Sequence, residues 1–357
     1  MGKIRYRWVL TVRCDRNSHS PISLFVQQVQ PLGGQVSWSR LQPSGRGELD
    51  PESVRFYRDL LGGLRARGVE PFVSLHHRDL PAALEADGGW AERGTAALFA
   101  GYARRTVGAL GDLATHWITL SEPWCPAFLA HGHGTHAPRR TDLNAAVATA
   151  HHLCLAHGLA TIAIREAAPR ARVGITNRVT DIVAACDSAA DRAAAGRLDA
   201  IVNRLFLDPI YHGRHGSEVL DCVEPLGLWA LVRTVDLEII SAPTDFAGIR
   251  RSERMIAYHD PAAPFEAGQH PARTAGRPAP SDPLHEVLTR VATEYTRLPL
   301  YVTESDADHP DEAAPLRDEE RVDHRTRERV PTLSALWYRD LVVAHGAVSE
   351  MDSVPAA

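Results

Sequence analysis

The spacing of apolar residues along the chain predicts helices that alternate with short strands. The clearest helix begins after Asp50-Pro51, because Asp is a favoured N-cap residue and proline is tolerated in the first turn. Apolar residues then recur at three- and four-residue spacing, which places them on one buried helix face: Val54, Tyr57, Leu61 and Leu64. The apolar run Val69–Leu75 follows this helix and predicts a buried strand.

The same alternation continues along most of the chain. Further helices are predicted over Thr95–Leu110, over Asn144–Ala167, and from Asp282-Pro283 onward. The predicted strands are Arg5–Val12, Gln35–Trp38, Val69–Leu75, His116–Leu120, Arg172–Thr176, Phe246–Ile249 and Leu298–Thr303. Strands that alternate with helices in this way are typical of a parallel sheet covered by helices. The sequence therefore predicts an α/β protein of the (β/α)8 TIM-barrel type, which has eight strands when complete.

Two stretches interrupt this pattern. Residues 305–331 are acidic, rich in Arg and nearly without apolar residues, so they cannot supply a buried last strand. Residues 259–283 include a run rich in Pro, Ala and Gly, which is typical of a loop. We expect a single barrel domain over residues 1–357, with flexible loops at both stretches and the last strand missing or irregular. Such a barrel is open between strands seven and one, and an exposed strand edge favours a homodimer.

Composition narrows the class of protein. The chain has 357 residues, of which 44% are hydrophobic and 23% charged, so it can bury a large core. A net charge of −5 argues against a nucleic-acid partner. The five cysteines contain no C-x-x-C pair, and no apolar run is long enough for a membrane helix. We expect a cytoplasmic enzyme that acts on a small molecule, without a membrane or nucleic-acid partner.

Two glutamates stand at the carboxyl ends of predicted strands, where barrels carry their catalytic residues. Glu122 follows Trp117–Ser121, and Glu304 follows Leu300–Thr303. Cleavage of a glycosidic bond with retention needs such a pair, with one carboxyl group as the acid and the other as the nucleophile, roughly 5 to 5.5 Å apart. Two close carboxylates also disfavour double ionisation, which would keep the acid protonated near neutral pH. The alternative is that each glutamate is simply a solvated strand end.

Several segments around these glutamates resemble the family-1 glycoside hydrolases, the β-glucosidase family. The matching segments are Val36-Ser-Trp-Ser-Arg-Leu-Gln-Pro43, His77-Arg-Asp-Leu-Pro81 with Gly88-Gly-Trp90, Ser121-Glu-Pro123, His152-Leu153 with Ala156-His-Gly158, Phe206-Leu-Asp-Pro209, Thr303-Glu304, and Ser334-Ala-Leu-Trp-Tyr-Arg-Asp340. They keep the family's order over most of the chain, so the chain is similar to a shortened and divergent member.

The resemblance implies roles for individual residues. Glu122 would be the general acid/base and Glu304 the nucleophile of a retaining β-glycoside hydrolase. His77 would hydrogen-bond a sugar hydroxyl, with a satisfied packing histidine as the alternative. Arg40 would lie beneath the nucleophile and hold it ionised, because a nearby guanidinium lowers the pKa of a carboxyl group. Trp124 belongs to the same implied substrate-binding shell, and the family mechanism needs no cofactor.

The departures from the family pattern lie in that shell. Ser121 replaces the Asn that contacts the sugar 2-hydroxyl, and Arg78 replaces a Trp. The N-Y-Y motif after strand six becomes Arg250-Arg251-Ser252, and the Trp-rich segment of strand eight is not recognisable. A transition-state contact to the 2-hydroxyl contributes several kcal/mol. The sequence therefore predicts an unusual glycoside or metabolite as the substrate rather than an ordinary glucoside.

The added charges and histidines have two interpretations each. Arg78, Arg250 and Arg251 either bind an anionic group of the substrate, as Arg does well, or pair with acidic residues such as Asp306 and Asp308. A second group consists of three histidines: His131, His133 and His136. Their spacing could indicate a metal site, or they belong to a loop shaped by glycines. We predict no metal, because no carboxylate or Cys completes a ligand set.

Three functions remain open at this point. The first is a β-glycosidase that acts on an unusual glycoside. The second is a repurposed barrel that uses the glutamate pair for non-hydrolytic acid/base chemistry, such as cyclisation or isomerisation in small-molecule biosynthesis. The third is a non-catalytic binding protein. A covalent glycosyl-enzyme distinguishes the first, and dependence on the glutamates without an adduct distinguishes the second.

Overall fold

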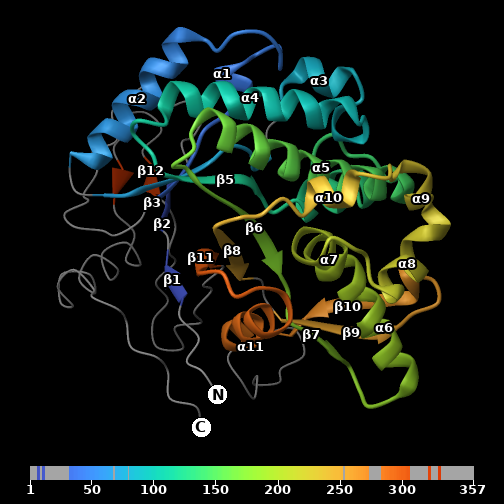
Figure 1. Ribbon diagram of the computed structural model, residues 1–357. Helices are drawn as coiled ribbons and strands as arrows, with labels where there is room; N and C mark the ends of the chain where they lie inside the picture. The colour runs from blue at the N-terminus through green and yellow to red at the C-terminus, as the bar shows by residue number, and fades with distance from the viewer. Residues whose placement is uncertain are drawn as a thin grey trace, which may run out of the picture.

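The computed structural model describes residues 6–8, 10–12, 32–66, 69–78, 80–251, 254–272 and 283–305, and the pairs 321–322 and 329–330. For residues 6–8, 10–12, 32–35, 251, 283, 304–305, 321–322 and 329–330 it describes the backbone alone. Helices pack around a curled parallel sheet, in the arrangement of a partial (β/α)8 barrel (Figure 1).

The large sheet contains eight strand segments in the order β1-β11-β8-β6-β5-β4-β3-β2, and every pairing is parallel. Its strands are β1 (Tyr6–Trp8), β2 (Leu10–Val12), β3 (Leu32–Gln35), β4 (Pro71–Ser74), β5 (His116–Ser121), β6 (Arg172–Val179), β8 (Phe246–Arg251) and β11 (Leu300–Ser305). Most predicted strands are confirmed. The second predicted strand, Gln35–Trp38, is wrong in its bounds, because Trp38 already begins helix α1 (Trp38–Leu41).

The first strand position is divided between β1 and β2, which lie on either side of Val9. β1 pairs with β11, while β2 pairs with β3 at the other end of the sheet. The predicted opening between strands seven and one is therefore wrong, because β1 takes the backbone hydrogen bonds that the edge of β11 offers. Beyond Ser305, the described segments β12 (Arg321–Val322) and β13 (Arg329–Val330) pair only with each other, so neither supplies a last barrel strand. The homodimer stays a prediction, but the open strand edge on which it was based is paired with β1.

A small sheet lies outside the barrel and occupies part of the predicted loop over residues 259–283. β10 (Ala267–Pro271) pairs antiparallel with β9 (Met255–His259), and β7 (Ile182–Ala184) pairs with β9 on its other side. The first part of that prediction is therefore wrong: β9 provides hydrogen-bond partners that a Pro- and Gly-rich sequence does not reveal. The predicted loop residues 273–282 lie outside the described residues, as do most residues of the second predicted loop, 305–331.

Helices cover the outer side of the barrel (Figure 1). Those not yet given are α2 (Pro51–Arg65), α3 (Ala82–Ala86), α4 (Gly94–Leu110), α5 (Leu143–Ala167), α6 (Ala189–Asp199), α7 (Leu205–His212), α8 (Ser217–Val223), α9 (Leu228–Leu231), α10 (Asp236–Ile240) and α11 (Pro283–Arg290). Short helical turns are η1 (Gly89–Ala91), η2 (Cys125–Gly132), η3 (Ala200–Arg204), η4 (Glu224–Leu226), η5 (Pro264–Glu266) and η7 (Val291–Tyr295). Asp50 caps α2 as predicted, since its carboxylate accepts a hydrogen bond from the Ser53 backbone N–H at 2.8 Å.

Helix α5 is long and apolar enough to cross a membrane by length and composition, but 83% of its most apolar window is buried inside the protein. It packs against α4 and α10 (Figure 1). A helix that is apolar on all sides is expected in the core of a large protein. We therefore interpret α5 as a core helix of the barrel.

The barrel interior is filled near the amino ends of its strands. Phe72 of β4, Ile118 of β5, Phe246 of β8 and Tyr301 of β11 form one buried cluster. The ring centroid of Phe72 lies 4.9 Å from that of Tyr301 and 5.6 Å from that of Phe246. Layers of large side chains fill the interior of such barrels. Polar chemistry is consequently left to the carboxyl ends of the strands.

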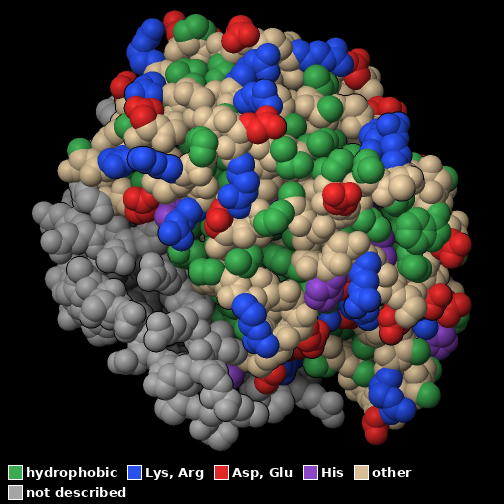
Figure 2. All heavy atoms as spheres, in the orientation of Figure 1, with side chains coloured by type: hydrophobic (Ala, Val, Ile, Leu, Met, Phe, Trp, Pro, Cys, Tyr) green, Lys and Arg blue, Asp and Glu red, His purple; other side chains and the backbone are tan. Residues whose placement is uncertain are grey.

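The surface carries both charge signs in close mixture. On the face shown in Figure 2, acidic and basic side chains alternate over the helices without a region of a single sign. Exposed pairs such as Arg58 with Asp112, at 2.7 Å, join α2 to the turn that follows α4. Exposed pairs of this kind contribute little to stability, so the buried core determines the fold.

The contact between α5 and α10 depends on Gly158. A Cβ atom at this buried position would lie 2.0 Å from the carbonyl oxygen of Ile239, a backbone atom that cannot turn aside. We expect Gly158→Ala to lower the free energy of unfolding by about 1–3 kcal/mol or more. Chemical denaturation measures this change.

Gly108→Ala in α4 is the matched control. A Cβ atom there meets nothing within 4 Å, so the free energy of unfolding should rise by about 0.4–1 kcal/mol. Equal effects of the two substitutions would contradict the close packing of α5 against α10.

Candidate active site

The two predicted catalytic glutamates both lie at carboxyl ends of barrel strands. Glu122 directly follows β5, and Glu304 is the penultimate residue of β11. The strand register shifts between Ile118 and Ser121 before the first, and between Val302 and Glu304 before the second. Such irregularities re-aim side chains next to active sites. The side chain of Glu304 lies outside the described residues, so the separation of the two carboxyl groups stays a prediction.

Glu122 is held in an unusual backbone conformation. Its φ angle is 56°, in the left-handed region that residues other than glycine rarely adopt. Its backbone N–H donates to the carbonyl oxygen of Thr176 on β6 at 2.8 Å. A left-handed residue costs of order 1–3 kcal/mol, so the neighbouring strands must stabilise it. Strain of this kind clusters at functional sites, and Glu122 is the residue that the sequence predicts to be catalytic.

The carboxyl group of Glu122 is fully buried and has three polar partners. His77 donates from Nε2 to Oε1 at 3.0 Å, and Arg250 forms an ion pair with the same oxygen. The thiol of Cys125 donates to Oε2 at 3.2 Å. Glu122 is therefore not a solvated strand end, which excludes the simpler interpretation of this residue.

These partners determine the charge of Glu122. Burial alone raises the pKa of a carboxyl group, but the hydrogen bond from His77 and the positive charge of Arg250 outweigh burial and hold the pKa of Glu122 at about 2. The sequence predicts an acid that is protonated near neutral pH. The lowered pKa instead indicates a carboxylate at neutral pH, held by the hydrogen bond from His77 and by the charge of Arg250.

Arg250 contacts a carboxylate that was not among the partners predicted for it. It reaches from the end of β8, is 12% exposed and pairs with Glu122, whereas Asp306 and Asp308 lie outside the described residues. Its register partner on β6 is Arg178. The guanidinium carbon of Arg178 lies 5.1 Å from the centre of the Trp124 ring, a cation–π contact.

At two predicted sugar-binding positions, Ser121 and Trp124, the side chains contact other protein groups. The hydroxyl of Ser121 lies 2.9 Å from the hydroxyl of Ser74, and both side chains are buried. Trp124 is 8% exposed and stacks on Phe128 with ring centroids 5.9 Å apart. Its indole N–H is buried without a hydrogen-bond partner among the described residues, so it can serve a ligand.

Two further predicted residues, Arg40 and Arg78, have contacts that the structure describes. The guanidinium carbon of Arg40 lies 5.6 Å from the centre of the Phe56 ring. Its contact with Glu304 stays a prediction, since the latter side chain is not described. Arg78 is exposed beyond β4, and its charge helps to lower the pKa of His136, after burial. Arg78 is therefore close to the loop that follows η2.

The histidines of that loop have separate surroundings. His131 is buried and its Nδ1 lies 2.8 Å from the carbonyl oxygen of Pro126. The ring centroid of His133 lies 6.2 Å from that of Trp124. In the described part of the chain, no three His, Cys, Asp or Glu side chains converge in a way that could hold a metal ion.

Comparison with known proteins agrees with this geometry. Residues 28–336 match the model of glycosyl hydrolase family 1. The chain belongs to this family. It is 34% identical over 287 residues to a β-glucosidase of Agrobacterium sp., an alignment that covers 76% of this chain and 61% of that enzyme.

Solved structures place the fold in the same family. A β-glucosidase from Exiguobacterium marinum matches with a TM-score of 0.72 and 32% identity, over 77% of this chain and 64% of that one. The AHE enzyme from Alicyclobacillus herbarius matches with a TM-score of 0.81 and 32% identity, over 89% of this chain and 84% of that one. The chain thus spans less than two thirds of the first two relatives named.

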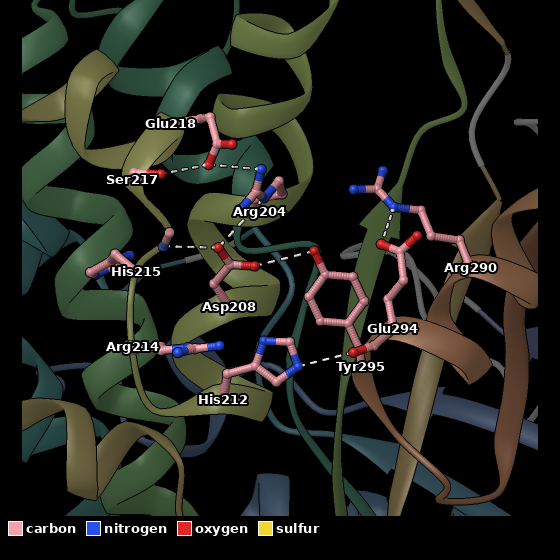
Figure 3. Close-up of a pocket in the computed structure, with 11 residues that line it drawn as sticks. Arg204, Asp208, His212, Arg214, His215, Ser217, Glu218, Arg290, Glu294 and Tyr295 are labelled. Carbon is pink, nitrogen blue, oxygen red and sulfur yellow. Dashed lines mark hydrogen bonds and ion pairs between the residues drawn. The ribbon is translucent and has the colours of Figure 1, made fainter.

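This member of glycosyl hydrolase family 1 also has a polar cavity of about 570 Å³ among its outer helices (Figure 3). The cavity lies between α7, α8 and η7 and shares no residue with the surroundings of Glu122. Asp208 accepts hydrogen bonds there from the Gly216 backbone at 3.1 Å and from the Tyr295 hydroxyl at 3.2 Å. Arg290 pairs with Asp199 at its edge. The hydrogen bond from Tyr295 to Asp208 connects η7 to α7. It gives the Phe206-Leu-Asp-Pro209 motif a structural role.

Sequence reasoning missed two residues of the Glu122 site. Cys125 stands three residues after Glu122 and its pKa is raised to about 12, first by burial and then by the neighbouring carboxylate. A thiol that remains protonated acts here as a hydrogen-bond donor. Arg178 is the other, and its only sequence signal is its place in the strand β6, which extends beyond the predicted end at Thr176.

The pH dependence of stability tests the ionisation of Glu122. Its pKa falls from 4.5 to about 2 on folding, so it stabilises the protein above pH 4.5 and this contribution is lost as pH falls toward 2. The full contribution is on the order of 3 kcal/mol. Glu122→Gln should flatten the stability curve between these pH values. At pH 7 it should cost about 3–5 kcal/mol, because it removes the carboxylate of a largely buried ion pair.

Chemical denaturation from pH 2 to pH 7 measures both effects. Glu52→Gln, at an exposed position of α2, is the control and should leave the curve nearly unchanged. Parallel curves for wild type and Glu122→Gln would contradict the lowered pKa.

Proposed function

We propose that this chain is a retaining β-glycosidase-like enzyme that uses Glu122 as the acid/base and Glu304 as the nucleophile. The observation that supports this most strongly is the fully buried carboxyl group of Glu122 at the end of β5, with a polar partner on each oxygen. Family membership adds weight, because the relatives named above include β-glucosidases.

The proposed reaction has two steps. The Glu304 carboxylate attacks the anomeric carbon, the bond from that carbon to the leaving oxygen breaks, and Glu122 gives its proton to this oxygen. Water then attacks the glycosyl-enzyme and restores the Glu304 carboxylate, while Glu122 takes a proton from the water. His77 and Cys125 stay hydrogen-bonded to Glu122 and keep its two oxygens in place.

The low pKa of Glu122 limits which substrates the free enzyme can use. With a pKa of about 2, only about one molecule in 10⁵ carries the proton at pH 7. Ser121 also replaces the amide side chain that would bind the sugar 2-hydroxyl. Its hydroxyl is already hydrogen-bonded to Ser74. Both features weigh against an ordinary glucoside and support an unusual glycoside as the substrate.

The Arg250–Glu122 ion pair also supports a second candidate. A permanently ionised Glu122 is a base rather than an acid, so the barrel would carry out cyclisation or isomerisation of a small metabolite. This candidate needs Glu122 but forms no covalent glycosyl-enzyme. The two candidates therefore differ in one directly observable species.

Trapping of the intermediate tests the proposed function. An activated 2-deoxy-2-fluoro β-glycoside should add one sugar to the wild type, and peptide mass spectrometry should place it on Glu304. Glu304→Gln should form no adduct and should not hydrolyse aryl β-glycosides. Glu122→Gln should lower the rate by about 10²–10⁴-fold with a poor leaving group.

Glu218→Gln, in the separate polar cavity, is the control and should retain wild-type rates. Activity that persists in Glu304→Gln would refute the nucleophile. Turnover of a metabolite that needs Glu122 while no adduct forms would favour the second candidate.

A further inference from the structure

The two carboxyl oxygens of Glu122 have unequal partners. Oε1 forms an ion pair with Arg250 and accepts a hydrogen bond from His77 Nε2 at 3.0 Å. Oε2 accepts a hydrogen bond from the thiol of Cys125 at 3.2 Å. A carboxylate has about four lone-pair sites, two on each oxygen. The described partners therefore occupy both sites of Oε1 and leave one site of Oε2 for another group.

The partners of the two oxygens also differ in strength. Arg250 brings a full positive charge to Oε1, and charge-assisted hydrogen bonds are roughly twice as strong as neutral ones. The thiol at Oε2 is only a weak donor. Oε2 is consequently the more basic of the two oxygens, and it is the oxygen that takes up a proton more readily.

The backbone fixes the thiol beside this oxygen. Cys125 is the first residue of η2, and its backbone N–H donates to the carbonyl oxygen of Glu122 at 2.9 Å. Both side chains are buried. Burial and the neighbouring carboxylate raise the pKa of the thiol to about 12. The thiol therefore keeps its own proton at neutral pH and donates it in a hydrogen bond.

We infer that Glu122 exchanges the catalytic proton through Oε2, and that Cys125 is a positioning residue whose thiol sets how readily this oxygen binds the proton. The inference rests on the proposed function and specifies how its acid/base works. In the first step the proton moves from Oε2 to the leaving oxygen, which keeps the electron pair of its broken bond to the anomeric carbon. In the second step the oxygen of water bonds to that carbon, and a proton of the water moves to Oε2. The thiol proton stays on sulfur throughout.

Other charged and titratable groups near Glu122 stay the same when Cys125 is replaced. The side chains of Arg251 on β8 and Glu304 on β11 lie outside the described residues. The described groups are His77 after β4, Arg78, His136 in the loop after η2, Arg178 on β6 and Arg250 on β8. Substitutions that change only the donor at position 125 therefore report on this one contact.

Infrared spectra of the S–H stretch test the contact itself. The difference between wild type and Cys125→Ala isolates the band of this thiol, and Cys154→Ala isolates the band of a matched buried thiol on α5. The pKa of Cys154 is raised to about 12 by burial alone. Because a carboxylate acceptor weakens the S–H bond, the Cys125 band should lie at the lower frequency and should move up when Glu122 becomes Gln. Equal frequencies, or no response to Glu122→Gln, would overturn the inference.

Kinetics with two leaving groups test the role of the thiol. A phenyl β-glycoside needs a proton on its leaving oxygen, whereas a 2,4-dinitrophenyl β-glycoside does not. Cys125→Ala removes the donor and increases the protonated fraction of Glu122, so kcat/KM for the phenyl glycoside at pH 7 should rise by about 3- to 10-fold. Cys125→Ser supplies a stronger donor and should lower it by a similar factor. The dinitrophenyl glycoside should respond little to either change, and Cys154→Ala and Cys154→Ser are the controls.

The opposite directions separate this role from a merely structural one, which would lower activity in both variants. Losses in both Cys125→Ala and Cys125→Ser, or equal changes on the two leaving groups, would overturn the inference. An adduct on Glu304 in the same experiments would leave the proposed function intact.

Failure of the proposed function gives a different result, since no glycoside is then turned over and no adduct forms. Infrared titration of the Glu122 carboxyl band still tests the thiol in that case. The pKa of Glu122 should rise in Cys125→Ala and fall in Cys125→Ser, because a hydrogen bond to the charged form favours that form. An unchanged pKa in both variants would overturn the role of Cys125.

Discussion

The buried ion pair between Glu122 and Arg250 is the interaction on which the chemistry of this barrel depends. Glu122 is fully enclosed, so its charge is set by its contacts rather than by water. Removing one partner of such a pair strands the other in a medium of low polarity, which is far more costly than losing a surface pair. The pair therefore favours the carboxylate form of Glu122 at neutral pH.

The scaffold brings the pair together through neighbouring strands. β5 delivers Glu122, β4 ends beside His77, and β8 delivers Arg250, while the aromatic cluster around Phe72 fills the interior toward the other end. Closure of the sheet between β11 and β1 keeps β8 and β11 in a continuous ladder even though no described segment supplies a last strand.

Much of this arrangement follows from the sequence alone. The periodicity after Asp50-Pro51 predicts α2, and the strand ends predict where Glu122 and Glu304 lie. The ion pair of Arg250 with Glu122 was not predictable from the sequence. The carboxylate that Arg250 reaches depends on the register of β5, β6 and β8 and on the side-chain rotamers. The hairpin of β9 and β10 was missed for a related reason: pairing with another strand, rather than local residue preference, stabilises it. The role of Arg178 depends on the same cross-strand register.

The ionisation state of Glu122 is the most direct test of this account. Infrared difference spectra between wild type and Glu122→Gln, recorded from pH 2 to pH 8, isolate the band of this one carboxyl group. We predict a carboxylate band in the free protein throughout the neutral range, with the protonated band appearing only as pH approaches the pKa of about 2. A protonated Glu122 at pH 7 in the free protein would contradict the account, since Arg250 would then not hold the charge.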